Sequence, residues 1–160
     1  KKPMENQPLK KMMIICSKAG IENVYAALIL AHGARAEGIE AEIFFTFFGL
    51  DAIHKDRMKS LRVATVGNPG MHMPTLLGAV PGMEAMATVM MQKEMEKLDI
   101  PGVEEFLQMI KDEGGKIFGC KLALDMFHLT RDDLWSGVDE TLTVGQFYER
   151  FTPDTQILFV

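Results

Sequence analysis

The chain has 160 residues, of which 48% are hydrophobic and 24% are charged, values that suit a folded soluble protein with one sizeable core. Its net charge of −5 argues against a general nucleic-acid-binding surface, which needs an excess of basic side chains. The most apolar long stretch, 71–91, is interrupted by two prolines, a histidine and Glu84, which makes it a poor membrane span. We therefore expect neither a nucleic-acid partner nor a membrane partner.

The two cysteines, Cys16 and Cys120, are far apart in the sequence and form no C-x-x-C motif. Two such thiols are typical of a protein in a reducing compartment. The first residues do not have the long apolar core of a signal peptide. We expect a cytoplasmic protein in which residues 1–8 are a flexible N-terminal segment and residues 9–160 are a single domain.

The first third of the chain predicts a strand–helix–strand unit. Residues 9–16 are an apolar run that predicts a buried strand. Apolar residues recur at the helical spacing over 21–37, and Gly38 ends that helix. Residues 41–48 predict a second buried strand, which Gly49 stops. The unit is long enough for a crossover between two parallel strands.

The remainder predicts shorter elements. A short charged helix is expected over 51–60, a strand over 61–66, and a loop over 67–82, where three prolines and four glycines occur. Further helices are expected at 83–98, 101–113, 129–134 and 144–151, and further strands at 116–119 and 155–160. Thr130 and Thr143 are the expected caps of the last two helices. The alternation of strands and helices predicts a three-layer α/β domain with a mostly parallel sheet of about five strands.

Candidate chemistry lies where the predicted strands end. The carboxyl ends of parallel strands meet at one edge of a sheet, and three such ends are 16–20, 46–49 and 118–121. Cys120 follows a strand and begins a helix, whose N-terminus favours a thiolate. The alternative is that Cys120 is a small buried hydrophobic residue, as free cysteines often are. Its position alone leaves both interpretations open.

Neighbouring residues extend this hypothesis. Lys121 and, across the sheet edge, Lys18 are expected to stabilise a thiolate at Cys120, and Gly119 is expected to leave the sulfur accessible. Cys16 is expected to be a core residue, with a role as an accessory thiol as the alternative.

Other motifs are weaker. No G-x-G-x-x-G follows the first strand, and the four histidines lack metal-ligand spacing. Neither a cofactor nor a metal is therefore predicted. The methionine stripe of Met83, Met86 and Met90 is expected to be a core face or an oligomer face.

The order of segments and several motifs resemble the DsrE/DsrF-like sulfur-relay family, and in particular its DsrE2 branch. The resemblance covers roughly residues 9–160 and rests on Ser17-Lys18, the strand end at 44–50, the proline-containing motifs at 73–78 and 81–82, and Gly119-Cys120 at the head of a helix. It implies a flavodoxin-like domain that forms homo-oligomers. It also implies persulfide chemistry at Cys120 and transfer of sulfur to a small carrier protein of the TusA type.

The leading hypothesis is therefore a cofactor-free sulfurtransferase or sulfur carrier. The Cys120 thiolate attacks a sulfane sulfur, holds it as a persulfide and yields it to a partner thiol, while Phe47 and Phe48 wall the pocket. Whether the protein turns over or only carries sulfur stays open. The alternatives are a non-catalytic oligomeric scaffold and a small-ligand-binding module at the same sheet edge.

Overall fold

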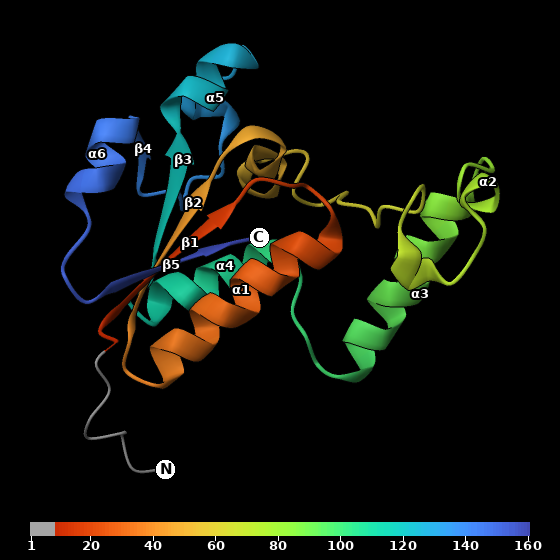
Figure 1. Ribbon diagram of the computed structural model, residues 1–160, viewed down its shortest axis with the longest axis horizontal. Coiled ribbons are helices and arrows are strands. Elements are labelled where there is room, and N and C mark those ends of the chain that lie inside the picture. The colour runs from red at the N-terminus through yellow and green to blue at the C-terminus, as the bar shows by residue number, and fades with distance from the viewer. Residues whose placement is uncertain (1–8) are drawn as a thin grey trace.

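Five parallel strands form one sheet in the order β4-β3-β2-β1-β5 (Figure 1). The computed structural model describes residues 9–160, so the flexible segment expected at 1–8 lies outside the described residues. The strands are β1 (Lys11–Cys16), β2 (Glu40–Phe45), β3 (Lys116–Cys120), β4 (Glu140–Leu142) and β5 (Thr155–Phe159). The predicted α/β fold with a parallel sheet of five strands is confirmed.

Helices cover the two faces of the sheet unequally. Helices α1 (Ile21–Ala36) and α4 (Val103–Asp112) lie on one face and pack against each other and the central strands (Figure 1). The short helix α6 (Val144–Glu149) covers part of the other face, where Phe147 packs on Phe44 of β2 with ring centroids 4.7 Å apart. This arrangement leaves the β1 and β5 side of that face less covered.

A buried ion cluster fixes α6 to the sheet. Glu42 of β2 accepts two hydrogen bonds from Arg150, at 2.7 and 2.6 Å, and forms an ion pair with Lys11 of β1 at 3.1 Å. Arg150 also stacks over the ring of Phe118, 4.4 Å from its centroid. Because Lys11 and Glu42 are both buried, each charge depends on the others for its stability.

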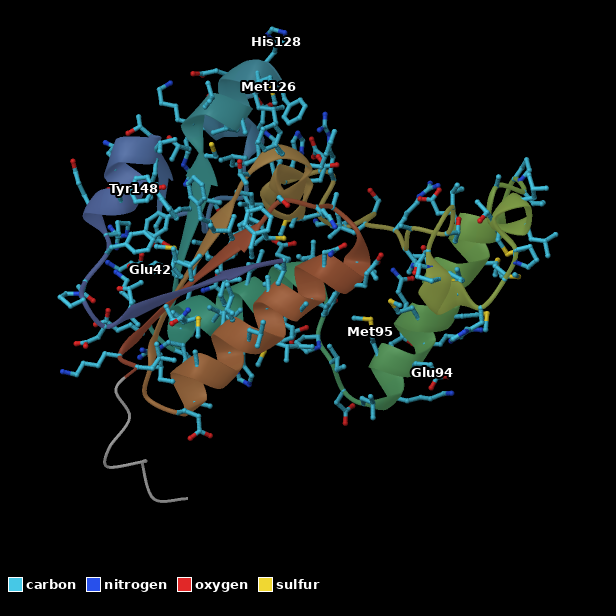
Figure 2. The ribbon with its side chains drawn as sticks, viewed as in Figure 1. Glu42, Glu94, Met95, Met126, His128 and Tyr148 are labelled. Carbon is cyan, nitrogen blue, oxygen red and sulfur yellow. The ribbon has the colours of Figure 1, made fainter. Side chains whose placement is uncertain are left out.

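The segment with η2 (Pro69–Met71), α2 (Thr75–Gly78) and α3 (Met83–Lys97) stands off the sheet as an arm (Figure 1). Met95 lies on the side of α3 that faces the body, whereas Glu94 points away from it (Figure 2). The predicted helix at 83–98 is confirmed. The methionine stripe does not form a core face, because Met86 and Met90 are exposed.

The strand expected over 61–66 is not formed. This segment is extended but has no neighbouring strand, because it leads from the body to the arm. Its polar groups bond to α1 and to the arm instead. The Arg62 carbonyl accepts from Ile21 N–H at 3.0 Å, Val63 N–H donates to Thr88 Oγ1 at 3.0 Å, and Thr65 Oγ1 donates to the Gly78 carbonyl at 2.8 Å.

The second strand ends earlier than expected. It stops at Phe45 rather than at residue 48, and the 3₁₀ helix η1 (Phe47–Ile53) follows in place of the helix expected over 51–60. Phe47 has a positive φ of 47°, which takes the chain out of the extended conformation, and the segment then lies close to β1. Thr46 N–H donates to the Cys16 carbonyl at 3.0 Å, and a Cβ at Gly49 would lie 2.1 Å from the Cys16 carbonyl oxygen.

The C-terminal elements follow the prediction with one omission. Thr130 and Thr143 cap η3 (Arg131–Asp133) and α6 through capping boxes. The three-residue strand β4 was not expected. Among residues 9–160, no helix has both the length and the apolar character to cross a membrane.

Candidate functional site at the carboxyl edge of the sheet

Cys120 is the last residue of β3 and the N-cap of the six-residue helix α5 (Lys121–Met126). The sequence predicted this position between a strand and a helix. Cys120 is buried, with 6% of the residue exposed. This position is compatible with both interpretations of Cys120, a functional thiol and a packed core residue.

Strand register determines which way Cys120 points. Gly119 pairs with Phe45 of β2, and Cys120 pairs with Leu142 of β4. Successive side chains of a strand point to opposite faces of the sheet. Cys120 therefore shares its face with Phe118, which is the face that α6 covers.

Gly119 lies on the opposite face. A Cβ there would contact side chains of Ile53, Leu134 and Leu50 at 3.4 to 3.7 Å. These are core residues. The absence of a side chain at Gly119 thus allows η1 to pack against β3. The position faces the core and does not line an opening to the Cys120 sulfur.

The two phenylalanines expected to wall the site are exposed. Phe47 and Phe48 begin η1 and are 51% and 64% exposed. Phe48 packs against Phe127, which follows α5, with ring centroids 5.5 Å apart. This aromatic pair joins the segment after β2 to the helix that Cys120 begins. Phe127 was not among the predicted site residues, because its separation in sequence from Phe48 gave no signal of contact.

The two predicted cations differ in their environment. Lys121 is exposed, and its Nζ lies 3.3 Å from Asp125 Oδ2 one helical turn further along α5. That partner neutralises part of the charge expected to stabilise a thiolate. Lys18 is exposed in the loop after β1, and its carbonyl accepts a hydrogen bond from Cys16 Sγ at 3.5 Å.

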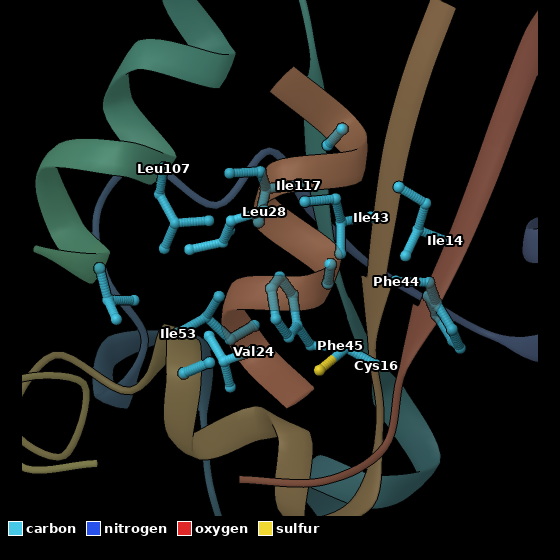
Figure 3. Packing of buried hydrophobic residues seen from close by; sticks show 14 of the residues in the cluster. Ile14, Cys16, Val24, Leu28, Ile43, Phe44, Phe45, Ile53, Leu107 and Ile117 are labelled. Carbon is cyan, nitrogen blue, oxygen red and sulfur yellow. The ribbon is translucent and has the colours of Figure 1, made fainter. Parts of the chain in front are cut away.

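Cys16 is a core residue, as expected. Its side chain is fully buried beside Val24, Phe45 and Ile53 (Figure 3). Burial raises the pKa of the Cys16 thiol to about 11, so the thiol stays protonated at neutral pH. Both cysteines are free.

No cluster of His, Cys, Asp and Glu side chains within residues 9–160 has the arrangement of a metal site. His32 instead pairs with Glu113 at 2.9 Å. His128 lies beyond the end of α5, at the top of the molecule (Figure 2). None of these histidines is therefore assigned a role in the chemistry of Cys120.

A hollow between α3 and the rest of the domain lies away from Cys120. It has a volume of about 740 Å³ and opens between α3 and the body, with Tyr25, Met95 and Trp135 among its lining residues. None of the predicted site residues lines it. The segment expected to be a loop over 67–82 belongs to the arm and contains η2 and α2.

The chain is an α/β protein with a five-stranded parallel sheet, in which a cysteine ends β3 and is the N-cap of a short helix. The chain belongs to the DsrE/DsrF/DrsH-like family, whose sequence model matches residues 8–159. It is 35% identical over 138 residues to the sulfur carrier protein DsrE2 of Allochromatium vinosum, a match that covers 81% of this chain and 86% of that protein. This similarity places it in the DsrE2-like branch.

Other relatives are more distant. The uncharacterized protein YrkE of Bacillus subtilis is 24% identical over 135 residues, covering 81% of this chain and 84% of YrkE. Among solved structures, MTH1491 of Methanobacterium thermoautotrophicum matches 94% of this chain and 99% of its own, with a TM-score of 0.59 and 12% identity. The ychN protein of E. coli matches 95% and 100%, with a TM-score of 0.56 and 15% identity. These two structures support the fold.

Proposed function

We propose that this protein is a sulfur carrier that holds sulfane sulfur as a persulfide on Cys120. The observation that carries the proposal is the position of Cys120 between β3 and α5, in a chain similar to a protein named as a sulfur carrier. The buried, protonated Cys16 offers no competing nucleophile. The free thiols accord with the cytoplasm as the compartment.

The chemistry is sulfur exchange without a cofactor. The Cys120 thiolate attacks the outer sulfur of a polysulfide or persulfide donor, a new S–S bond forms, and the donor leaves as a thiolate or shorter polysulfide. A partner thiolate then attacks the terminal sulfur, and the Cys120 thiolate leaves. The new S–S bond is about 2 Å long, so the terminal sulfur lies further from the backbone than Sγ does.

Uptake of sulfur tests the site. After incubation with polysulfide, the intact mass should rise in sulfur-sized steps that a reductant reverses. Cys120→Ser should abolish this gain, and Cys16→Ala should retain it. If Cys120→Ser took up as much sulfur as the parent and Cys16→Ala took up none, the sulfur would be carried by Cys16 and the proposal would be wrong.

The proposed acceptor is a small carrier protein of the TusA type. Its thiol is to receive the terminal sulfur from Cys120, with Phe47 and Phe48 at the rim of the contact. Mixing persulfidated protein with such a carrier should move the added mass to the carrier. A carrier that stays unmodified while the Cys120 persulfide persists would contradict this choice of acceptor.

We also propose a homo-oligomer in which the arm contributes an interface. The support is the exposed stripe on α3, since Met86, Val89 and Met90 are about half or more exposed and methionine suits adaptable contacts. Light scattering should show an oligomer that Met90→Lys weakens. A strict monomer at micromolar concentration would refute the proposal.

A further inference from the structure

The two edge strands of the sheet differ in their protection. β4 has three residues and includes Glu140, and both shortness and charge discourage an edge strand from pairing with another chain. β5 has five residues, and the segment 155–160 contains no charged side chain and no proline. Among residues 9–160, no strand lies beyond β5. An exposed strand of this kind is a template for a further strand.

The hydrogen bonds of β5 show which backbone groups face outward. Val160 N–H donates to the Ile15 carbonyl at 2.8 Å, and the Val160 carbonyl accepts from Ser17 N–H at 3.2 Å. Val160 therefore bonds inward, to β1. Backbone groups alternate in direction along a strand, so Leu158 also bonds inward. Ile157 and Phe159 direct both their N–H and their C=O groups away from the sheet.

The side chains of the same two residues are apolar and exposed. Ile157 is 42% and Phe159 is 69% exposed, and the register with β1 places Phe159 beside Ile15 on the face that α6 covers in part. Parallel strands are normally covered on both faces. Within the described residues, the outward backbone groups of β5 thus lack a neighbouring strand, and its exposed apolar side chains lack a covering helix.

We propose that β5 pairs antiparallel with β5 of a second copy across a two-fold axis, which joins two five-stranded sheets into one. With Ile157 on the axis, its N–H and C=O groups bond to those of the partner's Ile157. Phe159 then lies opposite the partner's Thr155. The Thr155 N–H already donates to the Thr152 carbonyl at 3.0 Å, so the Thr155 carbonyl is left to accept from the Phe159 N–H.

Charge favours a second copy as the occupant. Each copy carries a net charge of −5, so two copies associate most readily through a surface that brings no like charges together. The uncharged segment 155–160 is such a surface, and it offers no group that a charged partner would recognise. A two-fold pairing also makes every contact twice.

Hydrogen–deuterium exchange of the full chain tests this interface independently of the sulfur chemistry. The amides of Ile157 and Phe159 should exchange roughly tenfold or more slowly at high protein concentration than after dilution below the dimer dissociation constant. The amides of Leu158 and Val160 bond inward and should stay protected at both concentrations, so they serve as an internal control. Rapid exchange at Ile157 and Phe159 at every concentration would overturn the proposal, even if the arm held copies together.

A substitution gives a second test. Ile157→Pro removes one outward N–H and breaks no bond to β1, and proline is tolerated on an edge strand. The variant should lose the concentration-dependent protection of Phe159, with a fall in assembled mass by light scattering, whereas Ile157→Val should retain both. An unchanged mass and unchanged protection of Phe159 in folded Ile157→Pro would refute the pairing. If this variant does not fold, the exchange of the parent protein decides.

Discussion

Cys16 and Cys120 end two strands of the same sheet but point to opposite faces of it. Cys16 pairs with Phe45 and shares its face, and Gly119 pairs with the same Phe45 from the other side. Cys120 is one residue further and therefore faces the other way. β2 lies between the two strands, which sets the cysteine backbones about 10 Å apart, beyond the reach of a disulfide.

Oxidation should therefore produce no internal disulfide. We expect that after treatment with diamide, denaturing alkylation and mass spectrometry, no monomer has lost both thiols. Any disulfide should be intermolecular, through Cys120, and Cys16→Ala should give the same pattern. A monomer with an internal Cys16–Cys120 bond would contradict the arrangement of the two strands.

The burial of Cys16 should make stability depend on alkaline pH. Burial raises the pKa of its thiol from 9.0 to about 11, so folding favours the protonated form. The resulting stabilisation is fully present below about pH 9 and is lost as the pH rises through 11, by up to about 3 kcal/mol. Denaturant unfolding at several pH values should show a steeper alkaline loss in the parent than in Cys16→Ala. Equal slopes would show that Cys16 does not titrate in this way.

The ion cluster at Glu42 should control stability in acid. Burial alone would raise the pKa of the Glu42 carboxyl, but the hydrogen bonds from Arg150 and Lys11 outweigh burial and hold this pKa below 4.5. The stabilisation is present above pH 4.5 and is lost as the pH falls through the lowered pKa. Glu42→Gln should cost about 3 kcal/mol at neutral pH, because two cations lose their partner.

Glu140→Gln provides the control for that experiment, because Glu140 is exposed. We expect a change within about 0.5 kcal/mol for this variant. Urea unfolding at neutral and acid pH measures both variants. A loss in Glu140→Gln as large as that in Glu42→Gln would indicate that net charge, and not the buried cluster, sets stability.

The close approach of Gly49 to β1 gives a further prediction. A Cβ at position 49 would lie 2.1 Å from the Cys16 carbonyl oxygen, so Gly49→Ala should force η1 away from β1 and destabilise the fold by about 2 kcal/mol or more. Gly33→Ala should instead stabilise it by up to about 1 kcal/mol, because a Cβ at this position in α1 would meet nothing within 4 Å beyond its neighbours and the backbone of its own helix. Thermal unfolding of the two variants should shift in opposite directions.

Much of the fold could be predicted because the first unit has strong local signals. The buried run that became β1 and the helical spacing of α1 both gave elements near the expected bounds. β4 was missed because three residues are too few to show an alternation. The segment 61–66 resembled a strand in composition, but no neighbour pairs with it, and pairing is a property of tertiary structure.

The candidate site could be predicted in part for a similar reason. The position of Cys120 between a strand and a helix was predicted from the local sequence and is found in the structure. The contact of Phe48 with Phe127 could not be predicted, because these residues belong to segments that come together only in the folded chain. The pairing of Lys121 with Asp125 was missed although its i,i+4 spacing on one helix is a local signal.

The order of the strands also has a consequence for folding kinetics. β1 occupies the position between β2 and β5, so Lys11 pairs with Glu40 on one side and with Thr155 on the other. The first pairing closes a short loop, and the second closes a loop through nearly the whole described chain. Because loop-closure entropy grows with length and non-local pairing slows folding, we expect β5 to join the sheet late. Until then, the outer edge of β1 stays open to incorrect partners.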